Sequence, residues 1–245
     1  MKALRCPVVE LRQYTLHPGQ RDALIDLFDR EFIESQEAAG ATVLGQFRDL
    51  DDPDRFVWLR GFADMPRRAK ALESFYGGPV WQAHRDEANA TMIDSDDVLL
   101  LRPASARGGF PLPAGSRPAP GEPAPLPPSL VLATIWYGKR PFDTTFVEFF
   151  QQRVRPALAE TGCEPLAYLQ SEHAPNTFPA LPVRMDEEVF VWFARFTDES
   201  HLDHHLNRLQ LSERWREEVL PTLSERWARA PDRLRLAPTE RSILR

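Results

Sequence analysis

Two stretches of nine residues, Phe56-Val-Trp-Leu-Arg-Gly-Phe-Ala-Asp64 and Phe190-Val-Trp-Phe-Ala-Arg-Phe-Thr-Asp198, decide the fold of this 245-residue chain. They share five identical residues at an offset of 134 positions, and both are rich in the aromatic and branched residues typical of β-strands. Trp81 and Trp215 keep the same offset beyond the strand. The sequence therefore contains an internal duplication.

The residues around the first stretch predict a complete structural unit, because apolar residues cluster over strands and recur every three or four positions over helices. The predicted elements are strand 8–14, helix 20–39, strands 42–47 and 55–63, helices 66–76 and 80–93, and strand 98–101. The same order returns in the second half, where residues 131–137 match residues 8–14 at an offset of 123. This β-α-β-β-α-β order is that of a ferredoxin-like unit.

Both copies of the strand are apolar at odd and even positions, so each sheet is expected to bury both faces. Helices of the same unit cover one face, and the simplest cover for the other face is the equivalent face of a second sheet. We therefore expect an α+β fold in which two ferredoxin-like βαββαβ units pair sheet to sheet. The sequence leaves open whether they pair within one chain or between chains of a homo-oligomer.

A proline-rich segment separates the two copies. Nine of the 23 prolines fall between Pro103 and Pro128, and a joint of this length reaches easily across such an assembly. The predicted domains are residues 1–103 and 129–245, joined by a linker over 104–128. The offset grows by 11 between the first and third strands, which indicates an insertion around residues 175–186 whose role the sequence does not define.

Composition excludes several classes of function. The net charge is −6 and no long basic run is interleaved with aromatic residues, so nucleic acid is not an expected partner. No apolar run approaches the roughly 20 residues of a membrane span, and we expect a cytoplasmic protein that binds no membrane. Two cysteines, Cys6 and Cys163, suggest neither a disulfide framework nor a metal site. Glycine-rich phosphate loops and Gly-x-Ser-x-Gly elbows do not occur, and no cofactor is expected.

Four segments of the first copy resemble the NIPSNAP family: Val9-Glu-Leu-Arg-Gln-Tyr-Thr15, Phe56-Val-Trp-Leu-Arg-Gly-Phe62, Phe75-Tyr-Gly-Gly-Pro-Val-Trp81 and His84-Arg-Asp-Glu-Ala-Asn89. The resemblance covers residues 8–103 well and the second half only as a degenerate copy. It implies the dimeric α+β barrel fold. Most NIPSNAP proteins have no assigned reaction. Relatives that share the barrel include cofactor-independent monooxygenases acting on aromatic polyketides, lactone isomerases and haem-degrading or haem-binding enzymes, so the fold alone does not select an activity.

Polar residues that only one copy carries are not required by the shared fold. The first copy has Arg12, Arg60, His84, Arg85 and Asn89. At the matching offsets the second copy has Ile135, Ala194, Glu218, Val219 and Leu223, whereas the pairs Tyr14/Tyr137, Trp58/Trp192 and Trp81/Trp215 persist. A polar ligand site is therefore expected in the first copy.

The candidate catalytic residues are His84 and Arg60. A neutral histidine facing the cleft between helix and sheet would abstract a proton from a phenol or an activated carbon. Arg60 or Arg12 would stabilise the resulting oxyanion or enolate. The candidate ligand-binding residues are Arg12, Tyr14, Trp58, Phe75, Tyr76, Trp81, Arg85 and Asn89. In the competing interpretation, His84 and Arg85 lie on the helix surface, Arg60 pairs with a carboxylate, and Trp58 and Trp81 are core residues.

Three histidines, His201, His204 and His205, lie within one short segment of the second copy. The first and last are about one helical turn apart and have the spacing of a zinc site. The segment lacks the glutamate of a His-Glu-x-x-His motif and has no evident fourth ligand. An exposed helix face is therefore the preferred interpretation, and no metal site is predicted.

Two hypotheses about function follow. In the first, the chain is a cofactor-independent oxygenase, isomerase or cyclase acting on an aromatic or polyketide-like small molecule in the cleft of the first copy. In the second, it is a non-catalytic scaffold that binds a ligand or another protein. The asymmetric polar set favours the first hypothesis, and the lack of a complete catalytic constellation favours the second.

Overall fold

Strands and helices alternate in the same order in both halves of the chain. The computed structural model describes residues 6–111, 117–122 and 124–245. The strands are β1 (Val8–Leu16), β2 (Thr42–Asp49), β3 (Arg55–Phe62), β4 (Met92–Pro103), β5 (Leu130–Gly138), β6 (Pro165–Ser171), β7 (Glu188–Phe196) and β8 (Asp232–Pro238). The α-helices are α1 (Arg21–Leu27), α2 (Ile33–Ala38), α3 (Met65–Tyr76), α4 (Pro79–Thr91), α5 (Thr144–Phe149), α6 (Arg155–Glu160), α7 (Glu199–Leu211) and α8 (Leu220–Arg226). Three π-helical turns connect some of them: η1 (Phe28–Phe32), η2 (Phe150–Val154) and η3 (Trp215–Val219).

The aspartate at the end of each duplicated nine-residue stretch is the N-cap of the helix that follows it. The side chain of Asp64 accepts a hydrogen bond from the backbone N–H of Arg67 at 2.7 Å, and that of Asp198 accepts one from His201 at 2.8 Å. Each bond satisfies a backbone donor that the first helical turn leaves free. The longest α-helices have only 13 residues, and none in the described ranges is long and apolar enough to cross a membrane.

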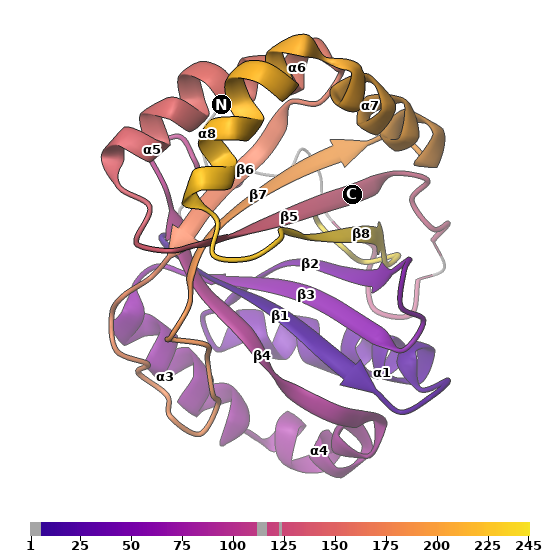
Figure 1. Cartoon of the computed structure of the whole chain (residues 1–245). Coiled ribbons are helices and arrows are strands. Elements are labelled where there is room, and N and C mark those ends of the chain that lie inside the picture. Colours follow the sequence, from indigo (N-terminus) through magenta and orange to yellow (C-terminus); the bar gives the residue numbers. More distant parts are fainter. Residues whose placement is uncertain (1–5, 112–116, 123) are drawn as a thin grey trace.

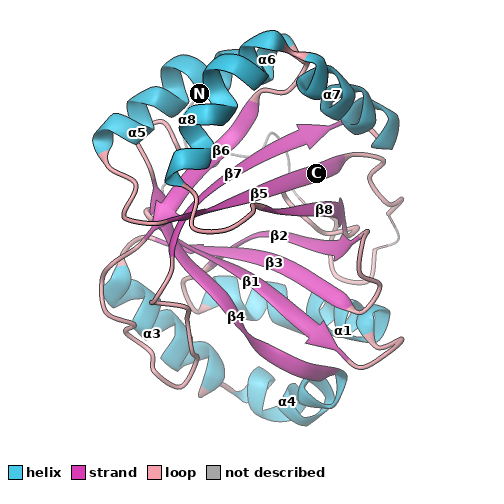
Figure 2. Ribbon diagram, viewed as in Figure 1, coloured by secondary structure: helices cyan, strands magenta, loops and turns pink. Residues whose placement is uncertain are grey.

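The eight strands form one closed antiparallel barrel in the order β1-β3-β2-β8-β5-β7-β6-β4 (Figure 1). The strand order is β4-β1-β3-β2 in the first half and β8-β5-β7-β6 in the second. The two sheets meet at their edges, where β2 pairs with β8 and β4 pairs with β6. The barrel therefore closes within one chain, and the helices of each half cover the outside of its own strands (Figure 2).

Apolar side chains from all eight strands fill the inside of the barrel. Residues at alternate positions point inward, such as Val9 and Leu11 of β1 and Val57 and Leu59 of β3, all at most 1% exposed. Phe110, from the segment between the halves, enters the same core and packs on Phe193 with ring centroids 5.0 Å apart. The inside of the barrel is therefore an apolar core, and the buried polar residues of the candidate site lie on the outer face of the sheet, beneath the helices.

The strand register corrects the sequence alignment of the two halves. Arg12 lies opposite Trp58, and Thr134 lies opposite Trp192. The true offset between β1 and β5 is therefore 122 residues, and the counterpart of Arg12 is Thr134, not Ile135. A slip of one residue in a strand exchanges its two faces, which is why an alignment of apolar letters alone chose the wrong register.

The insertion that the sequence indicated joins β6 to β7 and packs on the first half. Phe178 stacks on Tyr76 of α3 with centroids 5.9 Å apart, and Thr177 Oγ1 donates to the backbone oxygen of Met65 at 3.2 Å. Arg184 pairs with Asp97 of β4 at 2.8 Å. The insertion therefore covers α3 and one edge of the first sheet.

Candidate functional site

Each half carries a cavity at the same place, between the outer face of its sheet and its helices. Trp58 and Trp192, which are equivalent by register, line the cavities of the first and second half respectively. Tyr14 in the first half corresponds to Trp136 in the second at the corrected offset. The two cavities differ greatly in size and in the charge beside them.

In the first half the structure brings Arg12, Arg60, Tyr14 and Trp58 together, as expected from the sequence. All four point to the helix side of the sheet and are at most 8% exposed. Arg12 Nε donates to the Tyr14 hydroxyl at 3.0 Å. The guanidinium carbons of Arg12 and Arg60 lie 5.5 and 5.0 Å from the Trp58 ring centroid, within cation–π range.

Two residues of this cluster, Glu10 and Arg68, were missed in the sequence. Glu10 accepts hydrogen bonds from Arg12 at 2.8 Å, Arg60 at 2.8 Å and Arg68 at 2.6 Å, and its exposed fraction is 0%. Burial raises the pKa of Glu10, but the charges of Arg60, Arg12 and Arg68 together lower that pKa well below its usual range. For Glu10 the available sequence signal was its place two positions before Arg12 in an apolar strand, and Arg68, in α3, gave no such signal.

The cluster has no counterpart in the second half. Leu132, Thr134, Ala194 and Leu202 occupy the positions equivalent to Glu10, Arg12, Arg60 and Arg68. All four are buried, and none is charged. The fold is therefore stable without these charges.

The remaining polar candidates, all on α4, lie apart from this cluster. His84 is partly exposed and faces Glu87 and Glu31, at 3.4 and 3.7 Å. Arg85 is exposed and pairs with Asp86 at 3.3 Å, and Asn89 is also exposed. The structure therefore agrees with the competing interpretation that His84 and Arg85 lie on the helix surface.

The aromatic candidates Phe75, Tyr76 and Trp81 do line the first cavity. Their rings pack on one another with centroids 4.9 to 5.7 Å apart. This packing leaves a cavity of only about 30 Å³. A space of that size holds a group of a few atoms, not an aromatic substrate.

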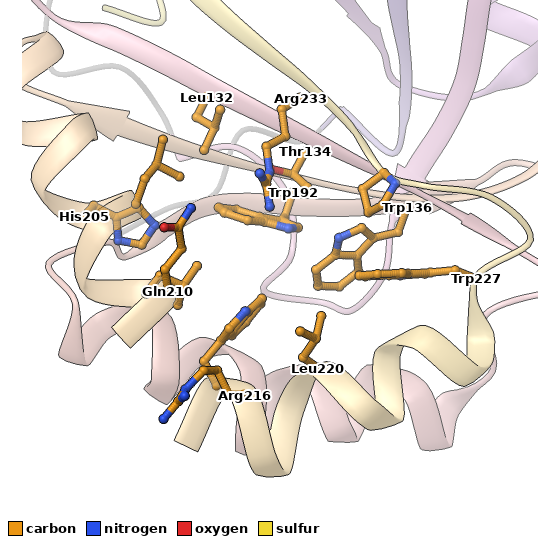
Figure 3. Close-up of a pocket in the computed structure, with 14 residues that line it drawn as sticks. Leu132, Thr134, Trp136, Trp192, His205, Gln210, Arg216, Leu220, Trp227 and Arg233 are labelled. Atoms are coloured by element: carbon orange, nitrogen blue, oxygen red, sulfur yellow. The ribbon is translucent and has the colours of Figure 1, made fainter. Parts of the chain in front are cut away.

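The second half holds a larger cavity, of about 270 Å³ (Figure 3). Its walls are mainly aromatic and aliphatic, with four tryptophans: Trp136, Trp192, Trp215 and Trp227. The rings of Trp136 and Trp192 have centroids 6.3 Å apart at an angle of 62°. This volume is close to the lower end of the range found for small-molecule sites, and its flat walls suit a planar apolar ligand.

Several polar atoms on the walls of this cavity have no partner. Thr134 Oγ1, Trp192 Nε1, Trp227 Nε1 and His205 Nε2 are buried and bond to no described residue. Buried polar atoms are normally hydrogen-bonded, and unpaired ones cost about 1–3 kcal/mol each. These atoms therefore keep unused hydrogen-bonding capacity beside the cavity.

His205 is the titratable group of the cavity, and its tautomer follows from its neighbours. Thr161 donates its only hydroxyl hydrogen to the backbone oxygen of Leu158 at 2.8 Å. The Thr161 oxygen, 2.9 Å from His205 Nδ1, must therefore accept a hydrogen from that nitrogen. This leaves Nε2 as a bare acceptor. Burial lowers the pKa of His205 to about 4, so the ring is neutral at pH 7.

The structure thus corrects the interpretation of the three histidines as one exposed helix face. His205 is fully buried, because it lies about one helical turn from both Leu202 and Leu209 in α7 and faces the sheet with them. His204 is exposed, and His201 faces Thr197. Within the described ranges, no three His, Cys, Asp or Glu side chains converge as metal ligands.

The sequence does not predict this second cavity, because the comparison of the two copies follows charged residues, which the second half lacks at these positions. A usable signal was present: four of the six tryptophans of the chain lie in the second half, at positions 136, 192, 215 and 227. Large indole rings enclose a cavity only where the side chains that face them are too small to fill the space between them. Leu209 and Gln210 stand where the first half has Phe75 and Tyr76.

The closed antiparallel barrel with outer helices, and a cavity under the helices of each half, defines the α+β barrel class of proteins. Three solved structures share this fold over nearly their whole length. Monooxygenase-like proteins from Lactobacillus acidophilus and Fusobacterium nucleatum match with TM-scores of 0.55 and 0.58, each at 11% identity, covering 95% and 97% of this chain and 94% of theirs. An anthrone oxidase-like protein matches with a TM-score of 0.59 at 12% identity, covering 98% of this chain and 94% of its own.

Within that class, residues 9–106, which are less than half of the chain, match the model of the NIPSNAP family. The resemblance drawn from the first-half motifs is thereby confirmed over these residues. No curated protein sequence matches the chain significantly.

Proposed function

We propose that this protein is a small-molecule enzyme that binds a planar aromatic substrate in the tryptophan-lined cavity of the second half and removes a proton from it. The observation that carries the proposal is the bare Nε2 of neutral His205 on the wall of a mainly apolar cavity. The proposed active site is therefore in the second half, whereas the sequence favoured the first, with His84 and Arg60.

The proposed step needs no cofactor. The substrate O–H, or an acidic ring C–H next to a carbonyl, gives its proton to His205 Nε2, and the electron pair stays on the substrate as a phenolate or enolate. The anion formed beside the ring stabilises the imidazolium, which burial alone disfavours. Thr134 Oγ1 and Trp192 Nε1 are free to donate hydrogen bonds to that oxygen. Arg233, which lies opposite Thr134 in the register and extends toward Trp192 (Figure 3), adds a positive charge at the cavity edge.

The resulting anion is the common start of isomerisation, of cyclisation and of reaction with molecular oxygen. The fold is shared with proteins described as monooxygenase-like and anthrone oxidase-like, which supports an aromatic substrate. Anthrone, a planar ketone with an acidic ring C–H, is therefore a suitable probe.

The test is hydrogen–deuterium exchange of anthrone in D₂O without oxygen, followed by NMR. We expect the protein to accelerate exchange at the acidic carbon. His205→Gln should lower the protein-dependent rate at least tenfold, while His204→Gln, which changes an exposed neighbour, should keep it. Equal rates with and without protein would overturn the catalytic proposal.

Anthrone that quenches tryptophan fluorescence saturably but does not exchange would support the second hypothesis, a ligand-binding scaffold. Trp192→Leu removes a cavity wall and should weaken that quenching, whereas Trp81→Leu in the first half should leave its midpoint unchanged.

We further infer that each half is a ferredoxin-like unit derived by tandem duplication, with domains over 1–103 and 129–245 and a linker over 104–128. The repeated strand order and the shared aspartate caps support this inference.

A further inference from the structure

The arginine cluster of the first half carries more positive charge than its own carboxylate neutralises. Arg12, Arg60 and Arg68 are at most 1% exposed, and each pairs with the same residue, Glu10. In the described residues no second carboxylate pairs with them, and the undescribed positions 1–5, 112–116 and 123 contain no Asp or Glu. Three guanidinium groups and one carboxylate leave two positive charges in excess.

Such an excess is costly in a buried place, because an uncompensated buried charge loses its hydration without gaining a partner. Packing alone does not require it, since the second half fills the same positions with Leu132, Thr134, Ala194 and Leu202. One nitrogen of Arg60 and one of Arg68 also lack any hydrogen-bond partner among the described residues. The cluster therefore has the charge and the free donors to attract an anion.

The small cavity beside the cluster presents donors rather than acceptors. Trp58 is 2% exposed and lines the cavity, and its Nε1–H has no partner in the described part of the chain. The Tyr14 and Tyr76 hydroxyl oxygens face Arg12 Nε at 3.0 Å and Arg60 Nη1 at 3.5 Å. Because each phenol oxygen faces an arginine donor, its own hydrogen is free to point elsewhere.

The side-chain amide oxygen that lines the cavity already accepts a hydrogen bond from within the protein. Gln36 Oε1 accepts from Arg60 Nη1 at 2.8 Å. The other lining residues are apolar, including Phe28, Phe32 and Met92. The cavity of about 30 Å³ has room for about two or three water-sized positions.

We propose that the first-half cavity binds a small planar oxyanion, free or as the carboxylate head of a larger molecule, through Trp58 Nε1 and the hydroxyls of Tyr14 and Tyr76. Arg12 and Arg60 supply the compensating charge from directly behind these donors. The insertion between β6 and β7 closes this region, since Arg68 donates to Asn176 Oδ1 at 3.0 Å and Phe178 stacks on Tyr76. The site is separate from the tryptophan-lined cavity and does not depend on the proposed reaction.

The test follows the indole N–H signals of ¹⁵N-labelled protein during titration with sodium formate, with sodium chloride as the ionic-strength control. The chain has six tryptophans and therefore at most six such signals. We expect one signal to shift saturably with formate but not with chloride, and to be missing from the spectrum of Trp58→Phe. Tyr14→Phe, which removes one donor and keeps the ring, should raise the formate dissociation constant at least tenfold.

Two control variants assign the binding to the first-half cavity. Tyr168→Phe removes a partly buried hydroxyl of the second half, which bonds Ser105 at 2.8 Å, and should leave the dissociation constant unchanged. Trp192→Phe alters the second-half cavity and should also leave it unchanged. A saturable shift with butyrate as well would identify a carboxylate head of a larger molecule, whereas a response to formate alone would identify a free small anion. The proposal is overturned if no indole signal shifts saturably, or if the shifting signal persists in Trp58→Phe.

Discussion

At the residue scale, Glu10 joins the three buried arginines of the first half. Its carboxylate is the one partner that Arg12, Arg60 and Arg68 share. Glu10→Gln removes that negative charge and leaves three buried cations, so we expect a loss of about 3–5 kcal/mol of unfolding free energy. Urea unfolding measures it. Asp22→Asn, which removes a largely exposed carboxylate, should cost less than about 1 kcal/mol, and equal losses would contradict this ranking.

The buried His205 makes stability depend on pH. Burial lowers its pKa to about 4, whereas an unfolded histidine titrates near 6.5. Between these values the unfolded chain binds the extra proton, so this contribution is complete above about pH 6.5 and is lost as the pH falls toward 4. A difference of one pKa unit corresponds to about 1.4 kcal/mol, so protonation of His205 should lower the unfolding free energy by about 3 kcal/mol in total. Urea unfolding of His205→Gln from pH 7 to 4.5 should show a flatter profile than that of His204→Gln; parallel profiles would refute the assignment.

At the element scale, the insertion between β6 and β7 connects the second half to α3 of the first. Phe178 stacks on Tyr76 and packs in the cluster around Leu72 and Leu100. Phe178→Ala should therefore lower the unfolding free energy by about 1–3 kcal/mol, below the full cost of a buried phenylalanine because the ring is only partly buried. Met185→Ala, in the same insertion but 46% exposed, is the matched control and should change it by less than about 0.5 kcal/mol.

Strands and helices could be predicted from the sequence, but the register between the halves could not. The period of apolar residues marks an element and its buried face only where the two faces differ. In β5 both faces are apolar, because Leu132 and Trp136 meet the helices and Val131 and Ala133 meet the barrel core. The amino-acid sequence alone then does not distinguish an offset of 122 residues between β1 and β5 from one of 123. The link between Glu10 and Arg68 could not be predicted either, because the residues of this cluster come from three elements that are distant in sequence, β1, β3 and α3.

At the scale of the whole molecule, one fold holds two cavities of different chemistry. The first is narrowed by packed aromatic rings and lies beside buried positive charge, and the second is wide and mainly aromatic, with the charges of Arg216 and Arg233 on its walls. The proposed duplication would account for this arrangement, because each copy would keep the barrel while the residues under its helices change independently. The charged half could be located correctly by comparing the two copies in sequence. The same comparison could not predict that the other half, with fewer charged and bulky side chains at these positions, has the larger cavity.

Closure of the barrel within one chain predicts how the molecule unfolds. Both seams, β2 with β8 and β4 with β6, join strands of different halves, and the core inside the barrel takes side chains from all eight strands. Neither half therefore keeps a complete core when the other opens, so thermal unfolding should be one transition by circular dichroism and by tryptophan fluorescence. Glu10→Gln in the first half and Phe193→Ala in the second should both lower the midpoint of that same transition. Two resolved transitions, each shifted by the variant of only one half, would show that the halves are independent domains.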